Sequence, residues 1–136
     1  MLKSFYKGRA LFRQTLSFNS SRLAPASLSS FAFSQTVGVP RERFPDERRV
    51  AVSPEGVEKL RKMGYSVRVE SNAGAEAKFI DAAYEKAGAE IVDAASAFGS
   101  DIVLKVRAPL EETADGVNEL KSLRSDSTLI SFVYPQ

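Results

Sequence analysis

The pattern of apolar and polar positions beyond residue 36 predicts strands that alternate with helices. Short apolar runs, or runs that alternate apolar with polar residues, are typical of strands. They occur at residues 36–39, 65–70, 89–92, 101–106 and 127–134. Helical spacing and capping residues predict helices at residues 54–63, 82–87, 94–98 and 116–123. Strands joined by helices at this spacing indicate βαβ units, and hence an α/β fold with a Rossmann-like, doubly wound and mostly parallel sheet.

Capping residues mark where the expected helices begin. Ser53 supplies a hydroxyl N-cap and is followed by Pro54, a residue favoured at the first helical position. Gly64 is expected to end this helix. Asp81 and Asp93 are expected to cap the second and third helices. These local signals support the order of elements that the periodicity predicts.

Basic residues are not evenly spread along the chain. Residues 1–36 contain no acidic residue, so the net charge of +2 hides a mildly acidic body with 14 of the 19 basic and all 17 acidic residues. We therefore expect no nucleic-acid partner. The absence of cysteine and histidine excludes disulfides, thiolate zinc sites and the commonest general base. No apolar run approaches the roughly 18 residues of a membrane span.

The first 36 residues have the composition of an organellar transit peptide. They contain many serines, and they lack the continuous apolar core of a secretory signal. Their five basic residues are Lys3, Lys7, Arg9, Arg13 and Arg22. We expect this tail to be disordered and to direct residues 37–136 to the mitochondrial matrix side of the inner membrane. A plastid address and a basic tail without any address are the alternatives.

Few residues of the body could carry chemistry. No glycine-rich fingerprint and no P-loop is present, so the residues predict no catalytic, cofactor-binding or metal site in this chain. Arg49 and Lys105 are cations within apolar sequence, where they must be paired or face a polar cleft. They could bind a small ligand together at the carboxyl edge of the sheet, or form structural ion pairs with acids such as Glu42, Asp46 or Glu47. Tyr134 could offer a hydroxyl at the end of the last strand or serve as a buried aromatic anchor.

Several longer segments resemble one known family. They are VGVPRERFPDERRVAVSPEGV, VRVESNAGAEAKFID, YEKAGAEIV, DIVLKVRAP and TLISFVYPQ. Together they cover residues 37–136, which resemble the N-terminal domain shared by proton-translocating NAD(P) transhydrogenases and alanine dehydrogenases. The resemblance implies transfer of hydride between NADH and NADP, coupled to proton translocation across the inner mitochondrial membrane. It implies NAD and NADP as cofactors of the parent enzyme.

The resemblance also implies partners and a pocket. Arg49 and Lys105 match the arginine and lysine with which alanine dehydrogenases bind pyruvate, whereas Tyr134 lies in the segment where those enzymes use a histidine. The NAD-fingerprint, membrane and NADP domains of transhydrogenases would be partners, together with a second copy in a homodimer. Because the sequence looks truncated after the last expected strand, we expect the fragment alone to be inactive and to bind no cofactor tightly. An alanine or saccharopine dehydrogenase relative and a non-catalytic interaction fragment are the alternatives.

Overall fold

The computed structural model describes residues 34–133. Most of the predicted transit peptide, with its expected disorder, lies outside the described residues, as does Tyr134. Strands and helices alternate along the described part. They are β1 (Thr36–Val39), α1 (Pro54–Lys62), β2 (Ser66–Glu70), the 3-10 helix η1 (Ala75–Ala77), α2 (Asp81–Lys86), β3 (Glu90–Val92), α3 (Ala94–Phe98), β4 (Ile102–Arg107), α4 (Glu119–Ser122) and β5 (Thr128–Phe132).

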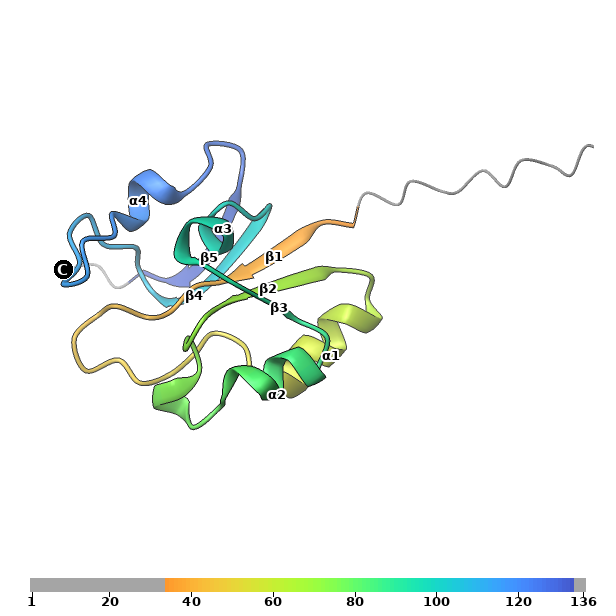
Figure 1. The fold of residues 1–136 in the computed structure, drawn as a ribbon. Coiled ribbons are helices and arrows are strands. Elements are labelled where there is room, and N and C mark those ends of the chain that lie inside the picture. Colours follow the sequence, from red (N-terminus) through yellow and green to blue (C-terminus); the bar gives the residue numbers. More distant parts are fainter. Residues whose placement is uncertain (1–33, 134–136) are drawn as a thin grey trace, which may run out of the picture. The chain divides into compact units, whose positions relative to one another are not determined.

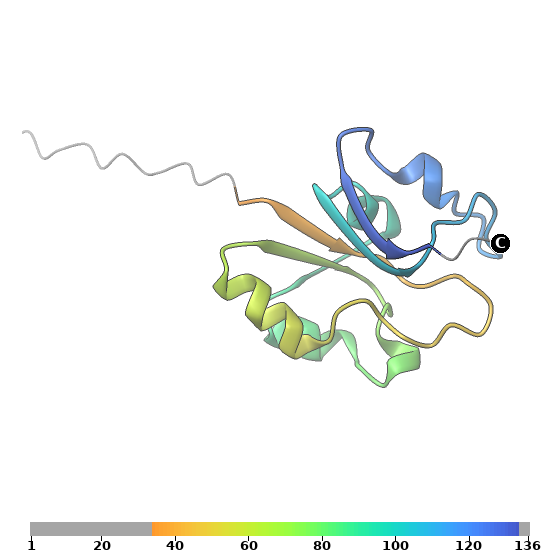
Figure 2. The same cartoon turned by 180° about the vertical axis from the view of Figure 1, so that it is seen from behind.

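The five strands form one parallel sheet in the order β3-β2-β1-β4-β5. Helices α1 and α2 cover one face of the sheet, and α3 and α4 cover the other (Figures 1 and 2). The chain thus winds in both directions from the central strand β1, with helices on both faces. This arrangement confirms the predicted doubly wound α/β fold.

The core under α1 and α2 is built from alternate strand residues. Val37 and Val39 of β1 pack with the matching valines of β2, and Val57 of α1 is fully buried against them. Tyr84 of α2 is also fully buried, and its hydroxyl donates a hydrogen bond to the carbonyl of Val52 at 2.9 Å. Burial raises the pKa of Tyr84 to about 12. The loop after β1 is therefore fastened to the core at its far end.

Gly38 lets α3 approach the opposite face of β1. A Cβ atom at this position would lie 1.9 Å from the carbonyl oxygen of Ala97 and 2.8 Å from the hydroxyl of Ser100. No side chain fits at such distances, so only glycine allows this packing. The run Val37-Gly38-Val39 thus places side chains on the α1 face and a close backbone contact on the α3 face.

The predicted helix ends are mostly confirmed. Ser53 accepts a hydrogen bond from the amide of Gly56 at 3.2 Å, and Asp93 accepts one from the amide of Ser96 at 2.9 Å. The prediction that Asp81 caps α2 is wrong. Ile80 is the N-cap residue, and the Asp81 carboxylate instead accepts hydrogen bonds from the Asn72 amide and the Ser71 hydroxyl.

The last helix and strand are shorter than predicted. Helix α4 begins only at Glu119, because Asn118 takes the N-cap position and Gly116 has a positive φ of 78°. Strand β5 lies at an edge of the described sheet, with Ile130 56% and Phe132 65% exposed. The apolar run that predicted this strand therefore leaves large side chains in contact with solvent. Among residues 34–133 no helix has the length and hydrophobicity needed to cross a membrane.

Candidate functional site

Charged side chains gather at the carboxyl ends of β1, β2 and β4. Strands β1 and β4 are neighbours in the sheet but not in the chain, so the strand order reverses between them. Ligands of open parallel sheets bind beside such a reversal. The loop after β1 and the segment after β4 lie at this same end (Figures 1 and 2). Ten charged residues there form what we term the edge cluster: Arg41, Arg43, Arg49, Lys105, Arg107, Glu42, Glu47, Glu70, Asp115 and Glu119.

Lys105 is the most deeply buried cation of the edge cluster. Its side chain is 1% exposed, and its Nζ lies 2.7 Å from Glu119 Oε1 and 3.5 Å from Glu42 Oε2. The ammonium also lies 5.8 Å from the centre of the Phe98 ring. A charge buried this deeply requires such partners. The predicted buried strand position of Lys105 is confirmed. Of the two alternatives for its role, the ion pair with Glu42 is present, and Glu119 is a nearer partner that the sequence did not predict.

Glu42 and Glu119 also fix the backbone around Lys105. The Glu42 carboxylate accepts hydrogen bonds from the amides of Val106 and Arg107, at 2.6 and 3.3 Å. Glu119 Oε2 accepts the amide of Leu110 at 2.8 Å. The two carboxylates therefore hold both the end of β4 and the segment that follows it.

Arg43 joins the end of β1 to the end of β2. Its guanidinium is 4% exposed and contacts both oxygens of Glu70, while its Nε donates to Asp115 Oδ2 at 2.8 Å. Arg41 Nη2 donates to the same Asp115 oxygen at 2.9 Å. Burial would lower the pKa of Arg43, but hydrogen bonds to Glu70 and Asp115 outweigh it and raise that pKa above its ordinary value. Burial would raise the pKa of Asp115, but hydrogen bonds from Thr113, Arg43 and Arg41 hold it well below its ordinary value.

Arg49 lies at the rim of the edge cluster. It belongs to no strand and its side chain is 61% exposed, but it forms an ion pair with Glu47, which was one of the two alternatives for Arg49. Apolar residues 50–52 pack on the core as an irregular segment, which leaves Arg49 outside. Arg49 Nε and Arg107 Nε donate to Glu47 at 2.7 and 2.9 Å. The hydrogen bond from Arg49 lowers the pKa of Glu47 to about 2, against the effect of burial.

The predicted site residues belong to one ionic network. Glu42 contacts the Lys105 ammonium and the Arg107 amide, and the Arg107 side chain contacts Glu47, which also binds Arg49. That Arg49 and Lys105 bind one ligand together stays a prediction. Tyr134, the third predicted pocket residue, lies outside the described residues.

Four important residues of the edge cluster were not singled out from the sequence. Glu119 lies in a polar helical segment, and Arg43, Glu70 and Asp115 lie beside turns, where charged residues are usually solvated. Arg43 offered one signal, because it sits in the charged loop that follows a strand ending in Pro40. Nothing local shows that its guanidinium reaches Glu70, since the contact depends on strand order.

The edge cluster is electrically balanced and internally satisfied. Five cations face five acids, and every buried side-chain nitrogen or oxygen within residues 34–133 has a hydrogen-bond partner. The described part of the chain holds no group of three or more residues suited to a metal ion. In this state the cluster orders three strand ends, and a ligand that binds there must displace an internal partner.

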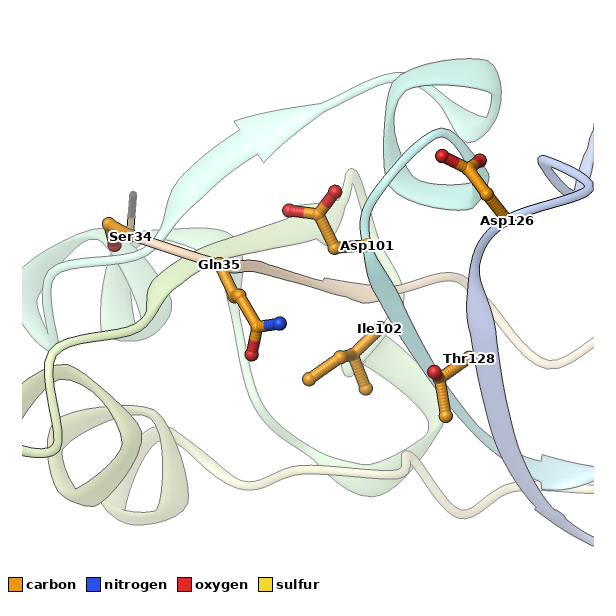
Figure 3. Close-up of a pocket in the computed structure, with 6 residues that line it drawn as sticks. All are labelled: Ser34, Gln35, Asp101, Ile102, Asp126 and Thr128. Atoms are coloured by element: carbon orange, nitrogen blue, oxygen red, sulfur yellow. The ribbon is translucent and has the colours of Figure 1, made fainter. Parts of the chain in front are cut away.

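Two hollows lie at opposite edges of the sheet. One, of about 240 Å³, is lined by Arg41, Arg43, Ala114 and Asp115 at the carboxyl edge. The other, of about 480 Å³, lies at the starts of β1, β4 and β5, and Figure 3 shows its lining side chains: Ser34, Gln35, Asp101, Ile102, Asp126 and Thr128.

The acids of the second hollow have structural partners. Asp101 Oδ2 accepts hydrogen bonds from the amide and the hydroxyl of Thr36, both at 2.8 Å. Arg124 lies 3.2 Å from the other Asp101 oxygen and 2.6 Å from Asp126. These contacts join the starts of the strands, so we assign this edge a structural role.

The fold and the edge cluster define a doubly wound parallel α/β domain with a charged cluster beside its strand reversal. A family model described as "Alanine dehydrogenase/PNT, N-terminal domain" matches residues 38–136. The chain belongs to this family.

Individual relatives agree with the family. The NAD(P) transhydrogenase subunit alpha of Haemophilus influenzae is 40% identical over 98 residues, which cover 72% of this chain and 18% of that protein. A solved L-alanine dehydrogenase superposes with a TM-score of 0.68 at 34% identity, covering 74% of this chain and 26% of that one. A solved transhydrogenase from Sinorhizobium meliloti superposes with a TM-score of 0.64 at 39% identity, covering 71% and 26%. The chain therefore spans about a quarter or less of the length of these relatives.

Proposed function

We propose that this chain is the N-terminal portion of a proton-translocating NAD(P) transhydrogenase. The parent enzyme transfers hydride between NADH and NADP and couples the transfer to proton movement across the inner mitochondrial membrane. The nicotinamides supply the chemistry, and the protein supplies placement. This division of labour suits a domain without histidine.

The observation that carries this proposal is the similarity to transhydrogenase alpha subunits over most of the chain, 40% over 98 residues in one case and 44% over 101 residues in another. The NAD-fingerprint, membrane and NADP domains of the parent are the proposed partners, in a homodimer.

Residues 1–36 are the proposed mitochondrial address. Fusion of these residues to a fluorescent protein tests the address, and uniform cytosolic fluorescence would contradict it.

A relative of alanine dehydrogenase is the second candidate. The family model covers both groups of enzymes, and the solved L-alanine dehydrogenase superposes about as well as the solved transhydrogenase. Binding of pyruvate or another oxo acid at Arg49 and Lys105 is the discriminating property. The structure disfavours it on charge: the single ammonium already faces two buried carboxylates, Glu119 and Glu42. An anion that approached Lys105 would therefore have to displace one of these two carboxylates.

A domain exchange tests the proposal. Residues 38–136 replace the matching segment of the Haemophilus influenzae alpha subunit, and membranes are assayed for hydride transfer from NADPH to an NAD analogue. We expect activity within about tenfold of the parent. The same exchange into an L-alanine dehydrogenase is the matched control, and we expect it to abolish pyruvate amination because Tyr134 replaces the histidine. Activity in the dehydrogenase chimera alone would overturn the proposal.

A further inference from the structure

We propose that Arg41 and Arg43 form a binding subsite for a small oxyanion, and that Asp115 occupies this subsite as an internal plug. The ligand group is a carboxylate or a phosphate. The subsite lies at the carboxyl edge of the sheet, in the hollow of about 240 Å³ that these three residues line with Ala114. The inference is independent of the hydride-transfer proposal.

The two arginines converge on a single point. Arg43 Nε and Arg41 Nη2 donate to the same oxygen of Asp115, at 2.8 and 2.9 Å. Two guanidinium groups around one anionic oxygen are the arrangement with which proteins recognise carboxylates and phosphates. The donors are therefore already placed for an oxyanion.

Arg43 is held in position by groups other than Asp115. Glu70 takes both terminal nitrogens of its guanidinium, and the Arg43 side chain is 4% exposed. The Arg41 amide donates to Glu70 at 2.8 Å, which fixes the backbone between the two arginines. Removal of the Asp115 charge would leave Arg43 Nε pointing into the hollow, with its orientation still set by Glu70.

The side chain of Asp115 is more exposed and less firmly held than that of Arg43, which it contacts. Its side chain is 34% exposed, and it lies in the segment between β4 and β5, just before Gly116 with its positive φ. Apart from the two arginines, its carboxylate is held by the Thr113 hydroxyl at 2.7 Å. A free oxyanion competes with this internal carboxylate for the same two donors, so the plug lowers the apparent affinity of the subsite.

The test compares phosphate binding to the 136-residue chain and to its Asp115→Asn variant. Calorimetric titration is done at constant ionic strength with inorganic phosphate, and separately with acetate to distinguish a phosphate from a carboxylate preference. Asp115→Asn keeps the size of the side chain but removes the competing charge. We expect it to bind one or both anions about tenfold more tightly than the unmodified chain.

Two matched variants separate the subsite from a general charge effect. Asp126→Asn makes the same change in net charge at an Asp–Arg pair of the opposite edge, and we expect no gain in affinity from it. Arg41→Gln, added to Asp115→Asn, should remove the gain. An equal gain in Asp126→Asn, or a gain that survives Arg41→Gln, would overturn the proposal.

A third variant covers the case in which Asp115→Asn does not fold. Thr113→Val keeps every charge but removes the hydroxyl that contacts both the Asp115 carboxylate and the Val117 carbonyl. We expect a smaller gain of about threefold, because Asp115 still competes but is less well positioned. An affinity unchanged from the unmodified chain would then refute the plug.

Discussion

The buried ion pair of Lys105 allows a sharp test of what burial adds to an ion pair. Lys105→Met removes the ammonium that lies 2.7 Å from Glu119 and 3.5 Å from Glu42, all three side chains being at most 2% exposed. Methionine fills most of the volume, so the cavity contribution is small. The main effect is that two buried carboxylates lose the cation that they share, and only Arg43, 3.9 Å from Glu119, remains beside them.

The expected magnitude follows from this burial. Breaking a buried pair by removing one partner costs about 3–5 kcal/mol, because the remaining charge stays desolvated. Domains of this size have free energies of unfolding of about 5–15 kcal/mol. Lys105→Met should therefore lose about a fifth of the stability at the least, and nearly all of it if the domain is at the low end of that range. Urea denaturation followed by circular dichroism measures the free energy of unfolding directly.

Lys59→Met is the matched control. Lys59 pairs with Glu55 at 2.8 Å, almost the distance of the Lys105–Glu119 pair, but the two side chains are 66% and 76% exposed. Solvent screens such a pair, so we expect little change in the urea midpoint. Equal losses in the two variants would refute the argument from burial.

Three further predictions concern the acid limit, the last strand and the cofactor. The pKa of Glu47 is lowered from 4.5 to about 2, so its contribution to the free energy of unfolding is present above pH 4.5 and is lost as the pH falls to 2. Glu47→Gln should therefore cost about 2 kcal/mol of unfolding free energy at pH 7 and almost none at pH 2. An equal cost at the two pH values would contradict this. The exposed apolar side chains of β5 should make the chain self-associate; Phe132→Lys should reduce light scattering, whereas Met63→Lys, at another exposed apolar position, should not. Titration of the chain with NADH should give a dissociation constant larger than about 1 mM, because the sequence contains no glycine-rich turn to hold the pyrophosphate. Micromolar binding would show that the cofactor site was misplaced.

The sequence predicted the fold well because the fold depends on local patterns. Val37-Gly38-Val39 and the alternation in β2 give the strands, and Ser53 and Asp93 form the expected caps. Asp81 failed as a cap because a tertiary partner, the 71–72 turn, competes for its carboxylate. Such competition depends on which segments fold side by side, and no local window of sequence contains it.

The candidate site was predicted only in part for the same reason. Lys105 was recognisable because a cation within an apolar strand needs a partner, and that need can be read from neighbouring residues. Glu42 was one of the acids considered as its partner, but the nearer partner, Glu119, could not be read from the sequence. Glu119 and Asp115 reach the edge cluster only because β4 lies beside β1, and this contact joins residues more than 60 positions apart. Arg49 forms an ion pair with Glu47, one of the acids considered from the sequence, although its apolar neighbours pack without forming a strand.

Charge decides which part of the edge cluster can accept an anion. Lys105 faces two buried carboxylates, Glu119 and Glu42. Arg41 and Arg43 instead share the partly exposed Asp115, so removal of that one acid leaves two cations beside the hollow. One segment, between β4 and β5, supplies both Glu119 and Asp115. Displacement of that segment by a partner domain would thus expose both cation groups together. Phosphate affinity should then rise at the arginines, even where Lys105 stays paired with Glu42.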